Sequence, residues 1–172
     1  MEKLVVHTLH IYAVEAETKD DAIQAAQNFA DNETWSDWNE VGGRWSDELP
    51  DNCVAFSENE ALCREVIAKM QKQTSEAINE AIHLYGNLTI KDLLQDIRRY
   101  TLSGLPAAND DELDERLASF RIGKALDTVR GDTGSSQMFY DISDFSDDPK
   151  WFFLRALTRP EQQFLVAVDH HY

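Results

Sequence analysis

Apolar residues recur along this chain with two periods, and these periods predict which segments form strands and which form helices. The run from Leu4 to Ala16 is rich in β-branched residues and has no breaker, so it predicts a strand buried on both faces. After Thr18, a residue that can cap a helix, apolar positions follow a helical spacing as far as residues 31–32. The pattern therefore predicts a central strand followed by an amphipathic helix.

The middle of the chain combines one irregular segment with a long helical stretch. Residues 33–51 contain three of the four tryptophans and a pair of glycines, which indicates a loop and a strand or a bulged hairpin. Cys53 to Phe56 predicts a short strand. Residues 57–131 have a helical periodicity that is interrupted near Gly86 and Pro106, so we expect three consecutive helices there.

Strand-like runs return in the last part of the chain. They cover Met138 to Phe145, Trp151 to Thr158 and Gln163 to His171. This order of elements predicts an α+β fold with a mostly antiparallel sheet, helices on one side and three consecutive helices in the middle of the chain. We expect residues 1–172 to form a single domain, in which residues 57–131 are an insertion or a helical subdomain.

Composition and charge narrow the classes of function. Hydrophobic residues make up 42% of the 172 residues and charged residues 28%, which is typical of a globular protein and excludes a disordered chain. The net charge of -16 repels nucleic-acid phosphates and anionic membranes, so we expect neither as a direct partner. With no signal-peptide pattern and no membrane-spanning run, we expect a cytoplasmic protein. Cys53 and Cys63 match neither a zinc nor a disulfide framework and are expected to be buried.

The first candidate site lies between residues 35 and 47, where three tryptophans surround two glycines and an arginine. Tryptophan faces can stack on a planar ligand, an arginine fork binds carboxylate or phosphate, and adjacent glycines allow a close approach of the backbone. The pattern predicts a pocket for a small anionic, nucleotide-like molecule, formed by Trp38, Gly42, Gly43, Arg44 and Trp45. The alternative is a bulged strand whose tryptophans fill the core, with Arg44 paired to Asp37 or Asp47.

A motif in this segment combines with a second one near the C-terminus. The residues concerned are Trp35, Asp37, Val41, Gly42, Gly43, Arg44, Trp45 and Ser46, followed by Val168, Asp169 and His171. In these positions the chain resembles small uncharacterised proteins encoded by bacteriophages. The resemblance implies a phage or prophage setting, in which gene products often modify host functions, and it implies no particular activity.

The second candidate site is the histidine-rich run at residues 169–172. On a strand, Asp169 and His171 point to the same side. If the first strand lies beside this one, either His7 or His10 can join them, because a regular strand places those two histidines on opposite faces. Two histidines and a carboxylate suit Zn, Fe or Mn, so the cluster predicts a divalent-metal site. The alternative is a polar chain end in which Asp169 makes a local hydrogen bond.

The third candidate site is an acidic surface. Its carboxylates lie in the helix expected after residue 109 and around the strand that follows: Asp110, Asp111, Glu112, Asp114, Glu115, Asp141, Asp144, Asp147 and Asp148. A rigid face of carboxylates can imitate a row of phosphates and attract the basic groove of a nucleic-acid-binding protein. The alternative is an ordinary solubilising surface.

Each candidate site leads to a different function. We expect first a non-enzymatic accessory protein of phage type, which binds and inhibits a host protein with a basic surface, such as a defence protein, through nucleic-acid mimicry. Such binding should weaken steeply as salt rises. The second hypothesis is a module that sequesters a small anionic ligand, and the third is a metal-dependent enzyme that uses Asp169 and His171. No cofactor beyond a divalent metal is expected, and the sequence leaves the oligomeric state open.

Overall fold

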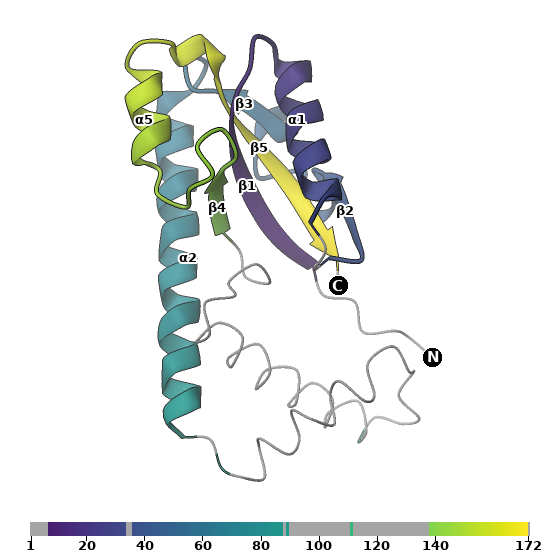
Figure 1. Cartoon of the computed structure of the whole chain (residues 1–172), viewed down its shortest axis with the longest axis vertical. Coiled ribbons are helices and arrows are strands. Elements are labelled where there is room, and N and C mark those ends of the chain that lie inside the picture. Colours follow the sequence, from purple (N-terminus) through teal and green to yellow (C-terminus); the bar gives the residue numbers. More distant parts are fainter. Residues whose placement is uncertain (1–6, 34–35, 88, 90–110, 112–137, 172) are drawn as a thin grey trace. The chain divides into compact units, whose positions relative to one another are not determined.

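This computed structural model describes residues 7–33, 36–87, 89, 111 and 138–171 (Figure 1). The strands are β1 (His7–Glu15), β2 (Trp38–Val41), β3 (Cys53–Ala55), β4 (Met138–Asp141) and β5 (Gln163–His171). The α-helices are α1 (Lys19–Asp31), α2 (Glu60–Gly86) and α5 (Lys150–Ala156), and short 3₁₀ turns form η1 (Gly43–Trp45), η2 (Pro50–Asn52) and η3 (Pro160–Gln162). None of the helices in this part of the chain has the length and apolar character needed to cross a membrane.

The sheet lies in one of two compact units of the chain, formed by Val6–Thr74 and Ser136–Tyr172. The other unit is formed by Met1–Val5 and Ser75–Ser135, and its main described part is the second half of α2. The two helices expected between α2 and residue 131 lie outside the described residues, apart from single positions. The boundary at residue 75 falls inside α2, so one helix contributes to both units.

β5 is the centre of the sheet, because it forms antiparallel pairs with three other strands. β1 pairs with it from His7, opposite His171, to Glu15, opposite Gln163. β2 and β3 pair with the two ends of its other edge. β4 adds a parallel pair on the free edge of β1. The predicted α+β class with a mostly antiparallel sheet is therefore confirmed.

Helices cover both faces of this sheet (Figure 1). As a result, β1 and β5 are buried on both sides. Alternate residues of β1, such as Tyr12 and Val14, pack with the alanines of α1 on one face. The residues between them, such as Ile11 and Ala13, pack with the first half of α2 and with α5 on the other face. The expectation of helices on one side was therefore wrong, since a strand that is apolar on both faces needs a covering layer on each.

The sequence signals for the helix α1 are confirmed. The side chain of Thr18 accepts a hydrogen bond from the backbone N–H of Asp21 at 3.2 Å, as an N-cap residue does. Ala22, Ala26 and Ala30 are buried and lie one above another, because they are spaced four residues apart on one side of the helix.

The run from Trp151 to Thr158 contains a helix, which corrects the strand expected there. α5 begins after Pro149, and the side chain of Asp148 accepts a hydrogen bond at 2.9 Å from the first backbone N–H of the helix. Phe152 and Ala156 are its buried residues and lie one helical turn apart. Aromatic residues favour strands in general, but the buried positions of this run follow the helical period.

Candidate metal site at the end of the sheet

The ends of β1 and β5 bring three potential metal ligands together on one face of the sheet. Pairing places His7 directly opposite His171, and Asp169 lies on the same face two residues earlier. One ligand atom from each of these side chains lies within 4.8 Å of the other two. The first strand is thus beside the last, as the metal hypothesis required, and His7 joins the cluster. His10 pairs with Val168 and lies on the opposite face.

Asp169 is the centre of this cluster. Its side chain is only 1% exposed, so hydrogen bonds take the place of water around its charge. Nδ1 of His7 lies 3.1 Å from Oδ2 of Asp169, and Nε2 of His171 lies 3.0 Å from the same oxygen. The histidine side chains are 21% and 16% exposed, which leaves the cluster accessible to solvent on the histidine side.

The turn η1 supplies two further hydrogen bonds to Asp169. The backbone N–H of Arg44 donates to Oδ2 at 2.9 Å, and the indole N–H of Trp45 donates to Oδ1 at 3.2 Å. Gly43 lies so close that a Cβ at this position would be 2.7 Å from both Cβ and Oδ2 of Asp169. The tryptophan-rich segment and the C-terminal cluster, which the sequence presented as separate sites, therefore share one carboxylate.

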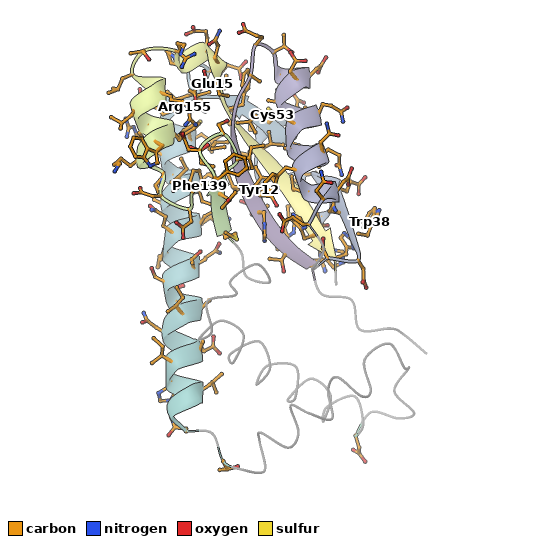
Figure 2. The ribbon with its side chains drawn as sticks, viewed as in Figure 1. Tyr12, Glu15, Trp38, Cys53, Phe139 and Arg155 are labelled. Atoms are coloured by element: carbon orange, nitrogen blue, oxygen red, sulfur yellow. The ribbon has the colours of Figure 1, made fainter. Side chains whose placement is uncertain are left out.

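The side chains of Trp38 and Arg44, two residues of the expected ligand pocket, lie at the surface. Trp38, which is labelled in Figure 2, is 52% exposed. Its ring packs edge-on against the ring of His171 with centroids 4.1 Å apart. The guanidinium of Arg44 is exposed, and in the described part of the chain it forms no ion pair with Asp37 or Asp47. Binding of a small anionic molecule by this segment stays a prediction.

A second polar cluster lies on the opposite face of the same strands. The hydroxyl of Tyr12 lies 2.9 Å from Nε2 of His170 and 3.2 Å from Nδ1 of His10. Nδ1 of His170 lies 3.2 Å from the hydroxyl of Ser36, which connects the loop before β2 to the sheet. Burial lowers the pKa of His170 to about 4 and raises the pKa of Tyr12, so both groups are neutral in neutral solution. This cluster is an internal hydrogen-bond network, and the alternation of side chains along β5 places His170 on the face opposite Asp169 and His171.

Arg155 of α5, which is labelled in Figure 2, binds acidic residues around β4, and this corrects one expected partner contact. Asp141 is fully buried, and its two carboxylate oxygens lie 2.8 and 3.0 Å from Nη2 of Arg155. Burial raises the pKa of Asp141, while the Arg155 guanidinium opposes this shift. Glu15 and Asp144 also form ion pairs with Arg155. Asp141 therefore belongs to the interior and not to a docking surface.

The other carboxylates of the expected acidic surface fall into two groups. The exposed ones are Asp111, Asp144, Asp147 and Asp148, of which Asp144 is paired with Arg155. Those outside the described residues are Asp110, Glu112, Asp114 and Glu115. The role of this surface in partner binding stays a prediction.

The cluster around Asp169 has the donor set of a transition-metal site. Two imidazole nitrogens and one carboxylate suit Zn²⁺, Fe²⁺ or Mn²⁺, whereas Ca²⁺ and Mg²⁺ prefer oxygen ligands. Carboxylates that bind metal are commonly oriented by hydrogen bonds, and the N–H groups of Arg44 and Trp45 orient Asp169 in this way. Without an ion, the same three side chains form a hydrogen-bonded bridge between the ends of β1 and β5.

Sequence reasoning missed two groups that hold Asp169. The guanidinium of Arg44 and the ring of Trp45 were expected to bind a ligand, but no role was expected for the backbone N–H of Arg44 or the indole N–H of Trp45, which both donate to Asp169. Their signal was the pair Gly42 and Gly43, which indicates a close approach of the backbone without naming what it approaches.

Comparisons of this chain with protein-family models, with curated proteins and with solved structures find no match.

Proposed function

We propose that this protein binds one divalent transition-metal ion through His7, Asp169 and His171. The approach of three ligand atoms to within 4.8 Å of one another is the observation that supports this function most directly. His7 and Asp169 are 162 positions apart in the chain, so the site depends on the register between β1 and β5 and exists only in folded protein.

The chemistry of the cluster favours zinc or a similar ion. Neutral imidazoles offer lone pairs, and the Asp169 carboxylate contributes a negative charge that is already oriented. The partial exposure of both histidines gives an ion access from solvent. An ion held by three protein ligands has a further position, which water, a substrate or another side chain can occupy. A water in that position would support metal-dependent catalysis, which was one of the three functions expected from the sequence.

Metal titration of untagged protein tests this function. We expect about one Zn²⁺ per chain after dialysis, measured by metal analysis and by calorimetry. His171→Ala removes a ligand and should weaken binding at least about tenfold. His83→Ala is the matched control, because it removes an exposed histidine of α2 and should leave the affinity unchanged. Metal content far below one ion per wild-type chain, or unchanged affinity in H171A, would reject the site.

Binding of a basic partner protein is the second candidate function. The net charge of -16 supports it, because such a field attracts positively charged surfaces over long range. In the unit that holds the sheet, Asp147 and Asp148 are exposed carboxylates that would contribute without first leaving an ion pair with Arg155. This function is independent of the metal site, because none of these residues belongs to the cluster around Asp169.

A further inference from the structure

The proposed metal site has one ligand fewer than zinc usually takes in a closed site. Zinc is commonly four-coordinate, and His7, Asp169 and His171 account for three positions. The fourth ligand comes either from water or from a neighbouring side chain on the same face of the sheet. The strand pairings show which side chains lie next to the cluster and could supply this ligand.

Three residues lie directly opposite members of the cluster on the strands beside β5, His7 itself aside. Leu9 of β1 is opposite Asp169, Trp38 of β2 is opposite His171, and Glu40 of β2 is opposite Asp169. Leucine has no ligand atom, and the indole nitrogen of tryptophan is a donor only. Among these cross-strand neighbours, Glu40 alone offers an oxygen that can bind a metal ion.

The register places Glu40 on the face of the sheet that carries the cluster. Residues directly opposite each other in an antiparallel pair point to the same side, with Cβ atoms roughly 5 Å apart. Trp38 demonstrates this at the adjacent position, because its ring contacts the ring of His171 at 4.1 Å. Glu40 follows Trp38 by two residues on the same strand, so its side chain emerges beside Asp169.

Glu40 is also free to move. It is exposed on β2, at the edge of the sheet, and forms no ion pair or side-chain hydrogen bond with the described residues. Its carboxylate is not one of the three groups within 4.8 Å of one another, so ligation requires rotation of its side chain toward the cluster. An exposed side chain makes such a rotation at little cost, because no ion pair or side-chain hydrogen bond with the described residues has to break.

Charge gives a reason for this movement. A divalent ion bound by two neutral histidines and one carboxylate retains one net positive charge, and a second carboxylate neutralises it. Before metal binds, the Glu40 and Asp169 carboxylates repel each other, which keeps Glu40 turned toward solvent. We propose that Glu40 is the fourth protein ligand and closes over the ion when it binds. This inference rests on the metal-binding function proposed above.

Metal affinity of a charge-matched pair of variants tests the role of Glu40. Glu40→Gln removes the anionic ligand, and Glu65→Gln removes the same charge from an exposed position on α2. Zn²⁺ titration should show at least about tenfold weaker binding in E40Q and wild-type affinity in E65Q. Both substitutions are at the surface, so each protein should fold normally. Equal affinity in E40Q and wild-type protein would overturn the ligand role while leaving the three-residue site intact.

The Co²⁺-loaded proteins give a second readout that does not depend on affinity. With Glu40 bound, wild-type Co²⁺ protein should show an intense tetrahedral visible spectrum that added azide or phosphate does not change. E40Q should bind these anions in the vacated position, with a change in the spectrum. A wild-type spectrum that responds to anions would overturn the inference, because the fourth position would belong to water or to a small anionic ligand. Failure of wild-type protein to bind Zn²⁺ or Co²⁺ at all would reject the metal-binding function itself.

Discussion

At the scale of single residues, Gly43 connects the two parts of the candidate site. It adopts a φ of 50°, in the left-handed region that glycine tolerates best, and it contacts the Asp169 side chain. Any side chain here meets a buried carboxylate that has no room to move, because hydrogen bonds to Arg44 and Trp45 hold it. Gly43 is therefore required for the geometry of Asp169, although it supplies no ligand.

Gly43→Ala should destabilise the protein by about 2 kcal/mol or more and should also weaken metal binding. The backbone penalty of a left-handed alanine is about 1 kcal/mol, and displacement of Asp169 adds to it. Urea unfolding and Zn²⁺ titration measure the two effects.

Gly86→Ala is the control for this variant. A Cβ at Gly86 meets nothing within 4 Å, and the residue ends α2, so the change should be neutral or slightly stabilising. Similar stabilities of G43A and wild-type protein would contradict the close contact with Asp169.

The candidate site was predictable residue by residue only in part. Strand alternation was enough to put Asp169 and His171 on one face and to show that His7 and His10 cannot both join them. The choice between those histidines needed the register of β1 against β5, which no local pattern contains. The contacts from η1 were beyond prediction for a similar reason, because Asp169 is about 125 positions away from Arg44.

At the scale of elements, the sequence pattern wrongly predicted a strand where the structure has the helix α5. In a strand, Phe152 and Leu154 would share a face, whereas in a helix they point in different directions. The structure has Phe152 fully buried and Leu154 48% exposed. The acid at position 148 and the proline at 149 were the helix-start signals that outweighed the aromatic content of the run.

Alanine substitutions at these two positions distinguish the helix from the strand. Phe152→Ala should cost about 3–5 kcal/mol, because it leaves a cavity between α5 and the sheet. Leu154→Ala should change stability by less than about 0.5 kcal/mol, because the side chain already faces solvent. Urea denaturation of both variants gives the comparison, and equal losses at the two positions would favour the strand.

At the scale of the whole molecule, the fold class followed from the order of elements, but the centre of the sheet did not. The apolar character of residues 4–16 indicated an internal strand, and β1 is one. The sequence contains no comparable sign that β5 would pair with three strands, because pairing depends on contacts between segments that are far apart in the chain. The helices on both faces of the sheet follow from the same two-sided burial, which the order of elements alone does not express.

Global stability should depend on pH through two buried thiols. Burial raises the pKa of Cys53 and of Cys63 from 9.0 to about 12. Between these values the unfolded chain loses the thiol protons while the folded chain keeps them. The free energy of unfolding should therefore be unaffected by the thiols below pH 9 and should fall as pH rises from 9 toward about 12.

Urea unfolding at a series of alkaline pH values measures this effect. The double variant C53A/C63A is the reference, since it lacks both thiols and retains every other titrating group. Its stability should be lower near neutral pH, because two buried side chains are shortened, but it should fall less steeply with pH than that of the wild type. Parallel pH profiles for the two proteins would contradict buried, protonated thiols.

The position of β5 in the chain also has a consequence for synthesis on the ribosome. β2 and β3 find their described sheet partner only in β5, and β1 finds its longest pairing there. All three strands leave the ribosome well before residues 163–171 do. Their edges and apolar faces therefore stay exposed, without that partner, while the intervening chain is made. Pairings this distant in sequence also close slowly. The nascent chain is therefore most exposed to proteases and to aggregation just before β5 emerges, and it is a natural client for chaperones at that stage.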